Sequence, residues 1–175
     1  MPLHTTDALI LRTYKLGESD RIVVFLTRDR GKKRGVAKNA RQSRRRFGGA
    51  LEPLTYGRVG YLERERHELV SLHYVEVLRS PLSAVDGEAL GYVSYFAELI
   101  DEWAPDADPN ETLFRLGVSM VEAIAAALPE DKRTAGVIGR EIVLRVPKPE
   151  FDQSVMQKAT ELVERLKNGG ATVTE

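Results

Sequence analysis

The spacing of apolar residues changes once along this chain of 175 residues, close to position 81. Before that point, short apolar or alternating runs are separated by glycine-containing turns, which is typical of β-strands. After it, apolar residues recur every three or four positions, which is typical of helices with one buried face. The sequence therefore predicts an all-β domain over residues 1–80 and a helical domain over residues 81–175.

Glycine-containing turns divide the first part of the chain into five expected strands. These strands cover residues 8–14, 21–27, 33–40, 54–63 and 68–78. Gly31 ends a predicted hairpin turn, and residues 17–20 are expected to form a tight, side-chain-capped turn that organises the fold. Five short strands with glycines at the bends favour a small closed barrel, and the OB-fold is the obvious candidate.

Two helices are predicted at the start of the second part. The first covers residues 86–104, and its apolar face consists of Leu90, Val93, Ala97, Ile100 and Trp103. The second begins with Asp108 as N-cap, Pro109 at the first helical position and Glu111 completing a capping box. Pro129 would end this helix. Its apolar face consists of Leu113, Leu116, Met120, Val121, Ile124 and Leu128.

The last part of the chain has a less regular pattern. Residues 130–150 fit either a strand or a buried helix. A last helix is predicted over residues 152–167, with Asp152 as its cap and glycines at its end. The assignment of residues 129–175 within the helical domain is therefore left open.

The net charge of zero hides a strong asymmetry between the two parts. Residues 1–80 carry 17 basic and 9 acidic side chains, a net charge of +8, and residues 81–175 carry 9 basic and 17 acidic ones, a net charge of −8. Net charge bears on association and not on fold, so two units with different partners are expected. The basic part suits a polyanion, and the acidic part would repel one.

The densest basic stretch marks the candidate binding site. Residues 30–46 contain nine basic side chains in seventeen positions and no acidic one. Nucleic-acid contact explains this run better than a solvated loop does, because each phosphate contact releases a condensed counterion. The predicted nucleic-acid-binding residues are Arg30, Lys32, Lys33, Arg34, Lys38, Arg41, Arg44, Arg45 and Arg46.

Aromatic residues close to this stretch could stack on unpaired bases. They are Tyr14, Phe47, Tyr56 and Tyr61. Aromatic side chains in small barrels are more often part of the core than of a stacking platform, so a core role is the favoured interpretation.

The sequence gives no sign of a catalytic or metal site. His4, His67 and His73 lack the spacing of metal ligands, and the chain has no cysteine. Ser19 and Ser43 have no plausible base nearby. The chain is therefore expected not to be an enzyme and to need no cofactor. The first ten residues do not resemble a signal peptide, and the absence of cysteine fits a reducing cytoplasm, so a cytoplasmic location is expected.

Four linked segments carry a resemblance to a known family. They are ALILR at 8–12, GESDR at 17–21, GKKRGVAK at 31–38 and RFGGALEP at 46–53. In order and spacing they closely resemble the N-terminal OB domain of the RecO family of recombination mediators. A looser resemblance continues through residues 92–103 and 109–114, so that about 5–128 are covered.

The resemblance implies a set of activities and partners. RecO-like proteins bind single- and double-stranded DNA, anneal complementary strands without ATP and help to load RecA. They join RecR and engage the acidic tail of single-strand-binding protein. Many also carry a four-cysteine zinc module in the helical domain, which a chain without cysteine cannot form.

Two other functions remain open from the sequence. An RNA-binding OB protein would use the same kind of groove, because barrel grooves accept either backbone. A protein-interaction adaptor would instead dock an acidic peptide on the basic barrel.

Overall fold

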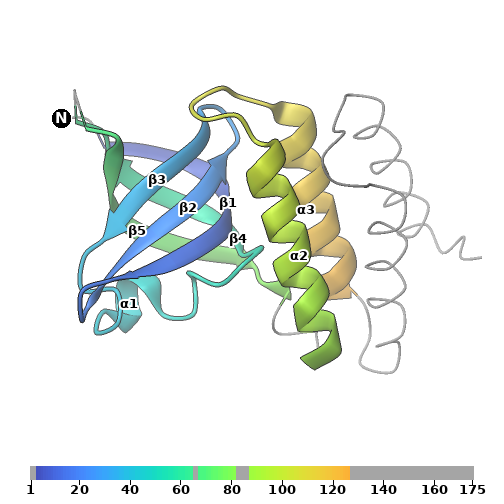
Figure 1. Cartoon of the computed structure of the whole chain (residues 1–175), viewed down its shortest axis with the longest axis horizontal. Coiled ribbons are helices and arrows are strands. Elements are labelled where there is room, and N and C mark those ends of the chain that lie inside the picture. Colours follow the sequence, from blue (N-terminus) through green and yellow to red (C-terminus); the bar gives the residue numbers. More distant parts are fainter. Residues whose placement is uncertain (1–2, 65–66, 82–86, 127–175) are drawn as a thin grey trace, which may run out of the picture.

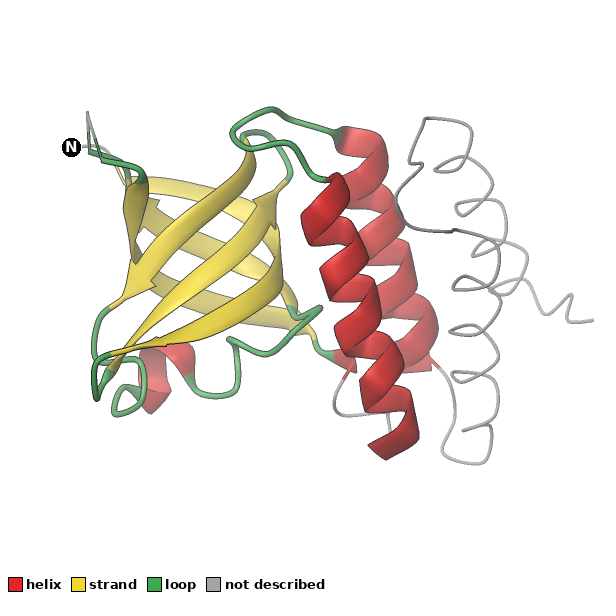
Figure 2. Ribbon diagram, in the orientation of Figure 1, coloured by secondary structure: helices red, strands yellow, loops and turns green. Residues whose placement is uncertain are grey.

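The computed structural model describes residues 3–64, 67–81 and 87–126. Five strands close into a barrel, and two long helices pack side by side against one flank of it (Figures 1 and 2). The elements are β1 (Leu3–Leu16), β2 (Asp20–Thr27), β3 (Gly31–Ala37), α1 (Arg44–Phe47), β4 (Tyr56–Leu62), β5 (Leu69–Arg79), α2 (Gly87–Trp103) and α3 (Glu111–Ala126). The predicted five-stranded OB-type barrel followed by helices is confirmed.

The barrel closes in the order β1-β2-β3-β5-β4, with β4 paired back onto β1. All neighbouring strands are antiparallel except β3 and β5, which run parallel. Closure leaves no long free edge in the sheet, which is how small barrels avoid unpaired backbone groups.

The start of β1 and the end of β3 differ most from the sequence-based prediction, and the other strand boundaries differ from it by two residues or fewer. β1 begins at Leu3, because residues 3–7 pair with β4, with Leu3 opposite Leu62. β3 ends at Ala37 and not at residue 40, because Asn39 has a φ of 53° and turns the chain away in the left-handed region. The short helix α1 lies in a stretch for which no regular element was predicted.

The predicted hairpin turn between β2 and β3 is present. Gly31 has a φ of +67°, a conformation that glycine adopts at little cost. The hydroxyl of Thr27 donates to the carbonyl oxygen of Gly31 at 2.7 Å and accepts the backbone N–H of Arg30 at 3.0 Å. These two bonds close the turn.

The apolar runs in β1 and β2 are continuous because both faces of these strands are buried. In β1, Ala8 and Ile10 lie in the barrel core, whereas Leu9 and Leu11 lie in a second core shared with the helices. β2 divides in the same way, with inward Val23 and Phe25 and outward Val24 and Leu26. The helices therefore cover the outer wall of these strands, and a strand buried on both sides loses the apolar–polar alternation.

The apolar faces of both helices are as predicted wherever the side chains are described. Val93, Ala97 and Ile100 of α2 are buried in the shared core. The buried side chains of α3 include Leu113, Leu116, Met120 and Val121. Three predictions lie outside the described residues. They are the end of the second helix at Pro129, the ambiguous segment 130–150 and the helix over residues 152–167.

The predicted N-cap of α3 was wrong. The side-chain oxygen of Asn110 accepts the backbone N–H of Leu113 at 2.9 Å, and its carbonyl oxygen accepts the N–H of Phe114 at 3.0 Å. Asn110 is therefore the cap, and Glu111 is the first helical residue. Asp108 lies two positions too early to reach the free N–H groups of the first turn.

The connection between α2 and α3 is hydrogen-bonded to the start of β3. Lys32 donates its backbone N–H to the carbonyl oxygen of Pro105 at 3.3 Å and accepts the N–H of Ala107 at 3.0 Å. The backbone of Asp108 lies directly against Gly31, where any Cβ atom would overlap it. Barrel and helices thus join through paired backbone as well as through a common apolar core.

Candidate nucleic-acid interface

The basic segment, which we define as residues 34–45, begins within β3, leaves the barrel after Ala37 and then passes the turn between β1 and β2. Asp20 accepts the backbone N–H of Asn39 through its Oδ1 at 2.8 Å. The carbonyl oxygen of Ser19 accepts the N–H of Arg41 at 3.2 Å. Gly17 has a φ of +61°, so the predicted tight turn is present, and the side chain of Asp20 accepts from Asn39 of the basic segment and not from within the turn. These two bonds hold the middle of the basic segment, at Asn39 and Arg41, against the turn between β1 and β2.

The short helix α1 anchors the end of the basic segment. Phe47 is 3% exposed and lies in the barrel core with Ala50. This anchor leaves Arg44 and Arg45 exposed to solvent. A four-residue helix with a buried aromatic end thus displays two guanidinium groups outward.

Arg46 differs from its two neighbours, because its side chain is used within the fold. It donates through Nη2 to the carbonyl oxygen of Lys38 at 2.9 Å and through Nε to the hydroxyl of Ser43 at 2.8 Å. Its guanidinium carbon lies 5.1 Å from the ring centre of Phe47, a cation–π distance. Arg46 therefore fastens α1 to the segment before it.

Five of the nine predicted binding residues are exposed and form no ion pair with any carboxylate in the described part of the chain. They are Arg34, Lys38, Arg41, Arg44 and Arg45. All five lie within twelve consecutive positions of the basic segment. Their charge is uncompensated over the described ranges, and this favours an external anion.

Lys32 lies under the helices and pairs with the acidic part of the chain. Its side chain is 10% exposed, and its Nζ lies 3.2 Å from Oδ1 of Asp101 and 3.6 Å from Oδ1 of Asp106. It also donates to the carbonyl oxygen of Asp101 at 2.7 Å. Since these contacts occupy the ammonium group, Lys32 connects barrel and helices.

Lys33 and Arg30 meet a carboxylate from the end of β4. Lys33 donates from Nζ to Oε1 of Glu63 at 2.8 Å, and Arg30 lies 3.9 Å from the other oxygen. The hydrogen bond from Lys33 is the main cause of a lowered pKa of Glu63. Arg30 stays exposed, and Lys33 is held along the barrel wall.

The four aromatic residues near the basic stretch have different environments. Phe47 and Tyr61 are in the barrel core, as the favoured interpretation expected, and burial raises the pKa of Tyr61 to about 12. Tyr56 packs edge-on against Phe114 of α3, with ring centres 6.3 Å apart. Tyr14 is 47% exposed on the outer wall of β1, where a base could reach it.

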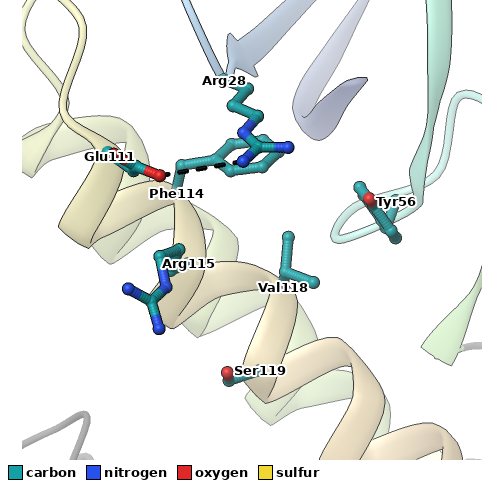
Figure 3. Close-up of a pocket in the computed structure, with 7 residues that line it drawn as sticks. All are labelled: Arg28, Tyr56, Glu111, Phe114, Arg115, Val118 and Ser119. Atoms are coloured by element: carbon teal, nitrogen blue, oxygen red, sulfur yellow. Dashed lines mark ion pairs between the residues drawn. The ribbon is translucent and has the colours of Figure 1, made fainter.

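A separate pocket of about 430 Å³ lies between the barrel and α3 (Figure 3). Arg28 and Tyr56 line it from the barrel side, and the others come from α3. The α3 residues are Glu111, Phe114, Arg115, Val118 and Ser119. Arg28 and Glu111 are 3.8 Å apart across the opening. No sequence pattern predicts this pocket, because its two sides are more than 50 positions apart in the chain.

Two family models match the chain in succession. The model described as recombination protein O N terminal matches residues 1–81, and the one described as recombination protein O C terminal matches residues 84–136. The chain belongs to the RecO family. The resemblance seen in the sequence is thereby confirmed.

Curated relatives in the RecO family are named DNA repair protein RecO. The relative from Koribacter versatilis is 49% identical over 120 residues, which is 68% of this chain and 49% of the relative. The relative from Geobacter metallireducens is 41% identical over 131 residues, 73% of this chain and 53% of the relative. The chain spans about half the length of these two relatives.

The zinc module of many RecO proteins does not fit the residues present here. The chain has no cysteine. Within the described ranges, no group of three His, Asp or Glu side chains could hold a metal ion. Neither α2 nor α3, the long helices of the described part, has the length and apolar character needed to cross a membrane.

Proposed function

We propose that this chain is a non-enzymatic DNA-binding protein of recombinational repair, which holds DNA strands through the basic segment. The observation that carries the proposal is the set of five exposed cations on residues 34–45, none of which forms an ion pair with a carboxylate of the described residues. Family membership supports DNA as the polyanion, because the curated relatives are named DNA repair proteins.

Annealing without ATP follows from the same electrostatics. Two DNA strands repel each other through their phosphates, and cations on one protein surface lower that repulsion while they hold both strands. Base pairing then supplies the free energy, so no bond in the protein or in a nucleotide has to break. Loading of RecA and association with RecR are proposed from the family resemblance, and an action in the cytoplasm follows from these roles.

The test compares two double variants that remove the same charge. Arg44→Ala/Arg45→Ala removes two cations of the basic segment, and Arg58→Ala/Arg64→Ala removes two exposed cations of the β4 region. With five phosphate contacts, the log–log salt slope on a single-stranded oligomer should be about −3.5. The first variant should lower its magnitude by about 1.4 and slow annealing, and the control should keep both values.

The outcome also separates the proposal from its alternatives. An equal effect of both double variants, or none, would contradict the basic segment as the DNA site. An RNA-binding protein would prefer RNA in a competition between matched DNA and RNA oligomers. For a protein-interaction adaptor, the affinity for the DNA oligomer and for the RNA oligomer would not depend steeply on the salt concentration.

We also propose the pocket of Figure 3 as the dock for the acidic tail of single-strand-binding protein, a partner that the resemblance implies. Arg115 offers an exposed positive charge, and Phe114 and Val118 offer apolar contact. An acidic peptide that carries an apolar side chain suits this combination. Arg115→Ala should weaken the binding of a labelled tail peptide at least about fivefold, whereas Arg58→Ala should not. Equal binding by both variants would refute this placement.

A further inference from the structure

A row of neighbouring side chains crosses the outer wall of the barrel next to the basic segment. Tyr14 of β1 lies opposite Ile22 of β2, Ile22 lies opposite Val36 of β3, and Val36 lies opposite Ser71 of β5. We call these four residues the outer row. Directly opposite residues on neighbouring strands are close enough to form one continuous surface.

The strand alternation fixes the direction in which the outer row points. Val23, Ala37 and Leu72, each next in sequence to a member of the row, are buried in the barrel core. Side chains alternate between the two faces of a strand, so the row points away from that core. Tyr14 is 47% exposed, and the other three side chains are partly exposed.

Two exposed cations flank the outer row, one on each side of Val36 along the chain. Arg34 lies two positions before Val36, and Lys38 lies two positions after it. Both are exposed and belong to the uncompensated set described above. Because residues two apart on a strand share a face, Arg34 has the same outward side as Val36. An apolar and aromatic strip thus has a positive charge beside it.

On the side of the row that faces the helices, the positive charge of Arg12 is already paired with a carboxylate. Arg12 lies on the same face of β1 as Tyr14, and its Nε is 2.8 Å from Oδ2 of Asp101 in α2. Burial opposes the charge of Arg12, but a hydrogen bond to Tyr14 and the carboxylates of Asp101 and Glu98 outweigh this and raise its pKa. The cations on this side, Arg12 and Lys32, are both paired with Asp101, so the open positive charge beside the row is that of the basic segment.

We propose that the outer row is a stacking platform for unpaired bases, so that this face selects single-stranded over double-stranded DNA. The inference rests on the proposed function and adds the strand type and the residues that recognise it. Tyr14 supplies the ring for the stack, Ile22 and Val36 extend the apolar floor, and Arg34 and Lys38 contact the adjoining phosphates. The bases of a duplex are already stacked on each other and cannot lie flat on a strand surface.

The experiment compares Tyr14→Ala, Tyr14→Phe and the unchanged chain. The oligomers are an oligothymidylate, a duplex of equal length, and an oligothymidylate whose central bases are replaced by abasic sites. Tyr14→Ala should weaken binding of the single strand by about 5- to 100-fold, the loss expected for one base stack. Binding of the duplex should change by less than about twofold, and Tyr14→Phe should behave like the unchanged chain.

The abasic strand separates stacking from phosphate contact. The unchanged chain should bind it about as weakly as Tyr14→Ala binds the intact strand, and Tyr14→Ala should lose nothing further on it. An equal loss on single strand and duplex, or no loss on either, would overturn the platform. If the unchanged chain bound no oligomer with a steep salt slope, the proposed function itself would fail. Thermal unfolding of Tyr14→Ala checks that this exposed position leaves the fold intact.

Discussion

The contact between Gly31 and the connection of α2 to α3 gives a sharp test of how the helices are held on the barrel. Gly31 has a φ of +67°, and a Cβ atom there would lie 2.6 Å from the carbonyl carbon of Asp108. Gly31→Ala therefore adds two separate costs. One is the left-handed backbone of an alanine, and the other is displacement of the segment that carries Asp108.

The two costs can be estimated separately. An L-residue in the left-handed region costs about 1–2 kcal/mol. Displacing the segment that carries Asp108 would weaken or break the two backbone hydrogen bonds that Lys32 forms with Pro105 and Ala107. Each of these bonds contributes about 0.5–1.5 kcal/mol. Gly31→Ala should therefore lower the free energy of unfolding by roughly 2–5 kcal/mol. Gly17→Ala is the matched control, because Gly17 has a φ of +61° with nothing within 4 Å of its Cβ position.

Urea unfolding followed by tryptophan fluorescence measures the difference. The single tryptophan, Trp103, packs against the core shared by barrel and helices and reports on that interface. Gly17→Ala should show only the backbone cost of about 1–2 kcal/mol. If Gly31→Ala and Gly17→Ala lowered the free energy of unfolding equally, the steric lock between Gly31 and Asp108 would be refuted.

Three further predictions concern single polar side chains, Lys32, Tyr61 and Glu63. Lys32→Met should lower the free energy of unfolding by about 1–3 kcal/mol, because the carbonyl oxygen of Asp101 loses the hydrogen bond from Lys32 and its carboxylate loses one of two cations. The affinity for DNA should stay within about twofold, and a large loss of affinity in a binding titration would contradict this. Tyr61→Phe should keep or raise the melting temperature, because the buried hydroxyl has no hydrogen-bond partner among the described residues; a marked drop would reveal a missed partner. The lowered pKa of Glu63, due mainly to its hydrogen bond from Lys33, makes the pair stabilising above the ordinary value of 4.5. The difference in stability between Glu63→Gln and the unchanged chain should therefore disappear as the pH falls through the lowered pKa, and a constant difference would argue against the pair.

Local signals in the sequence were reliable wherever neighbouring residues decide the structure. The turns at Gly17 and Gly31 were predicted because few other residues accept their backbone angles. The cap of α3 was misplaced because Asp108 and Asn110 are both good caps. The path of the chain between α2 and α3 decides between them, because it brings the side-chain oxygen of Asn110 within hydrogen-bond distance of the N–H of Leu113.

The binding residues depended more on the tertiary structure. Sequence shows nine cations in one stretch, and it cannot show that Glu63 and Asp101 come from 30 and 69 positions away to meet Lys33 and Lys32. Nor can composition tell that Arg46 fastens α1 to the segment before it. The nine residues as a set stay a prediction, and so does the division at residue 80.

The sequence alone determined the five strands, the two long helices, the turns at Gly17 and Gly31 and the sign of charge on each part, because periodicity, glycine conformation and residue charge are local properties. The tertiary structure decided which cations remain open to solvent, that Tyr61 is core and Tyr14 is surface, and that the outer row exists. These depend on which strands and helices become neighbours. A charge is compensated, and an aromatic ring is buried, by groups that lie close in space. The pairing of the strands into a closed barrel and the packing of the helices on it decide which groups these are.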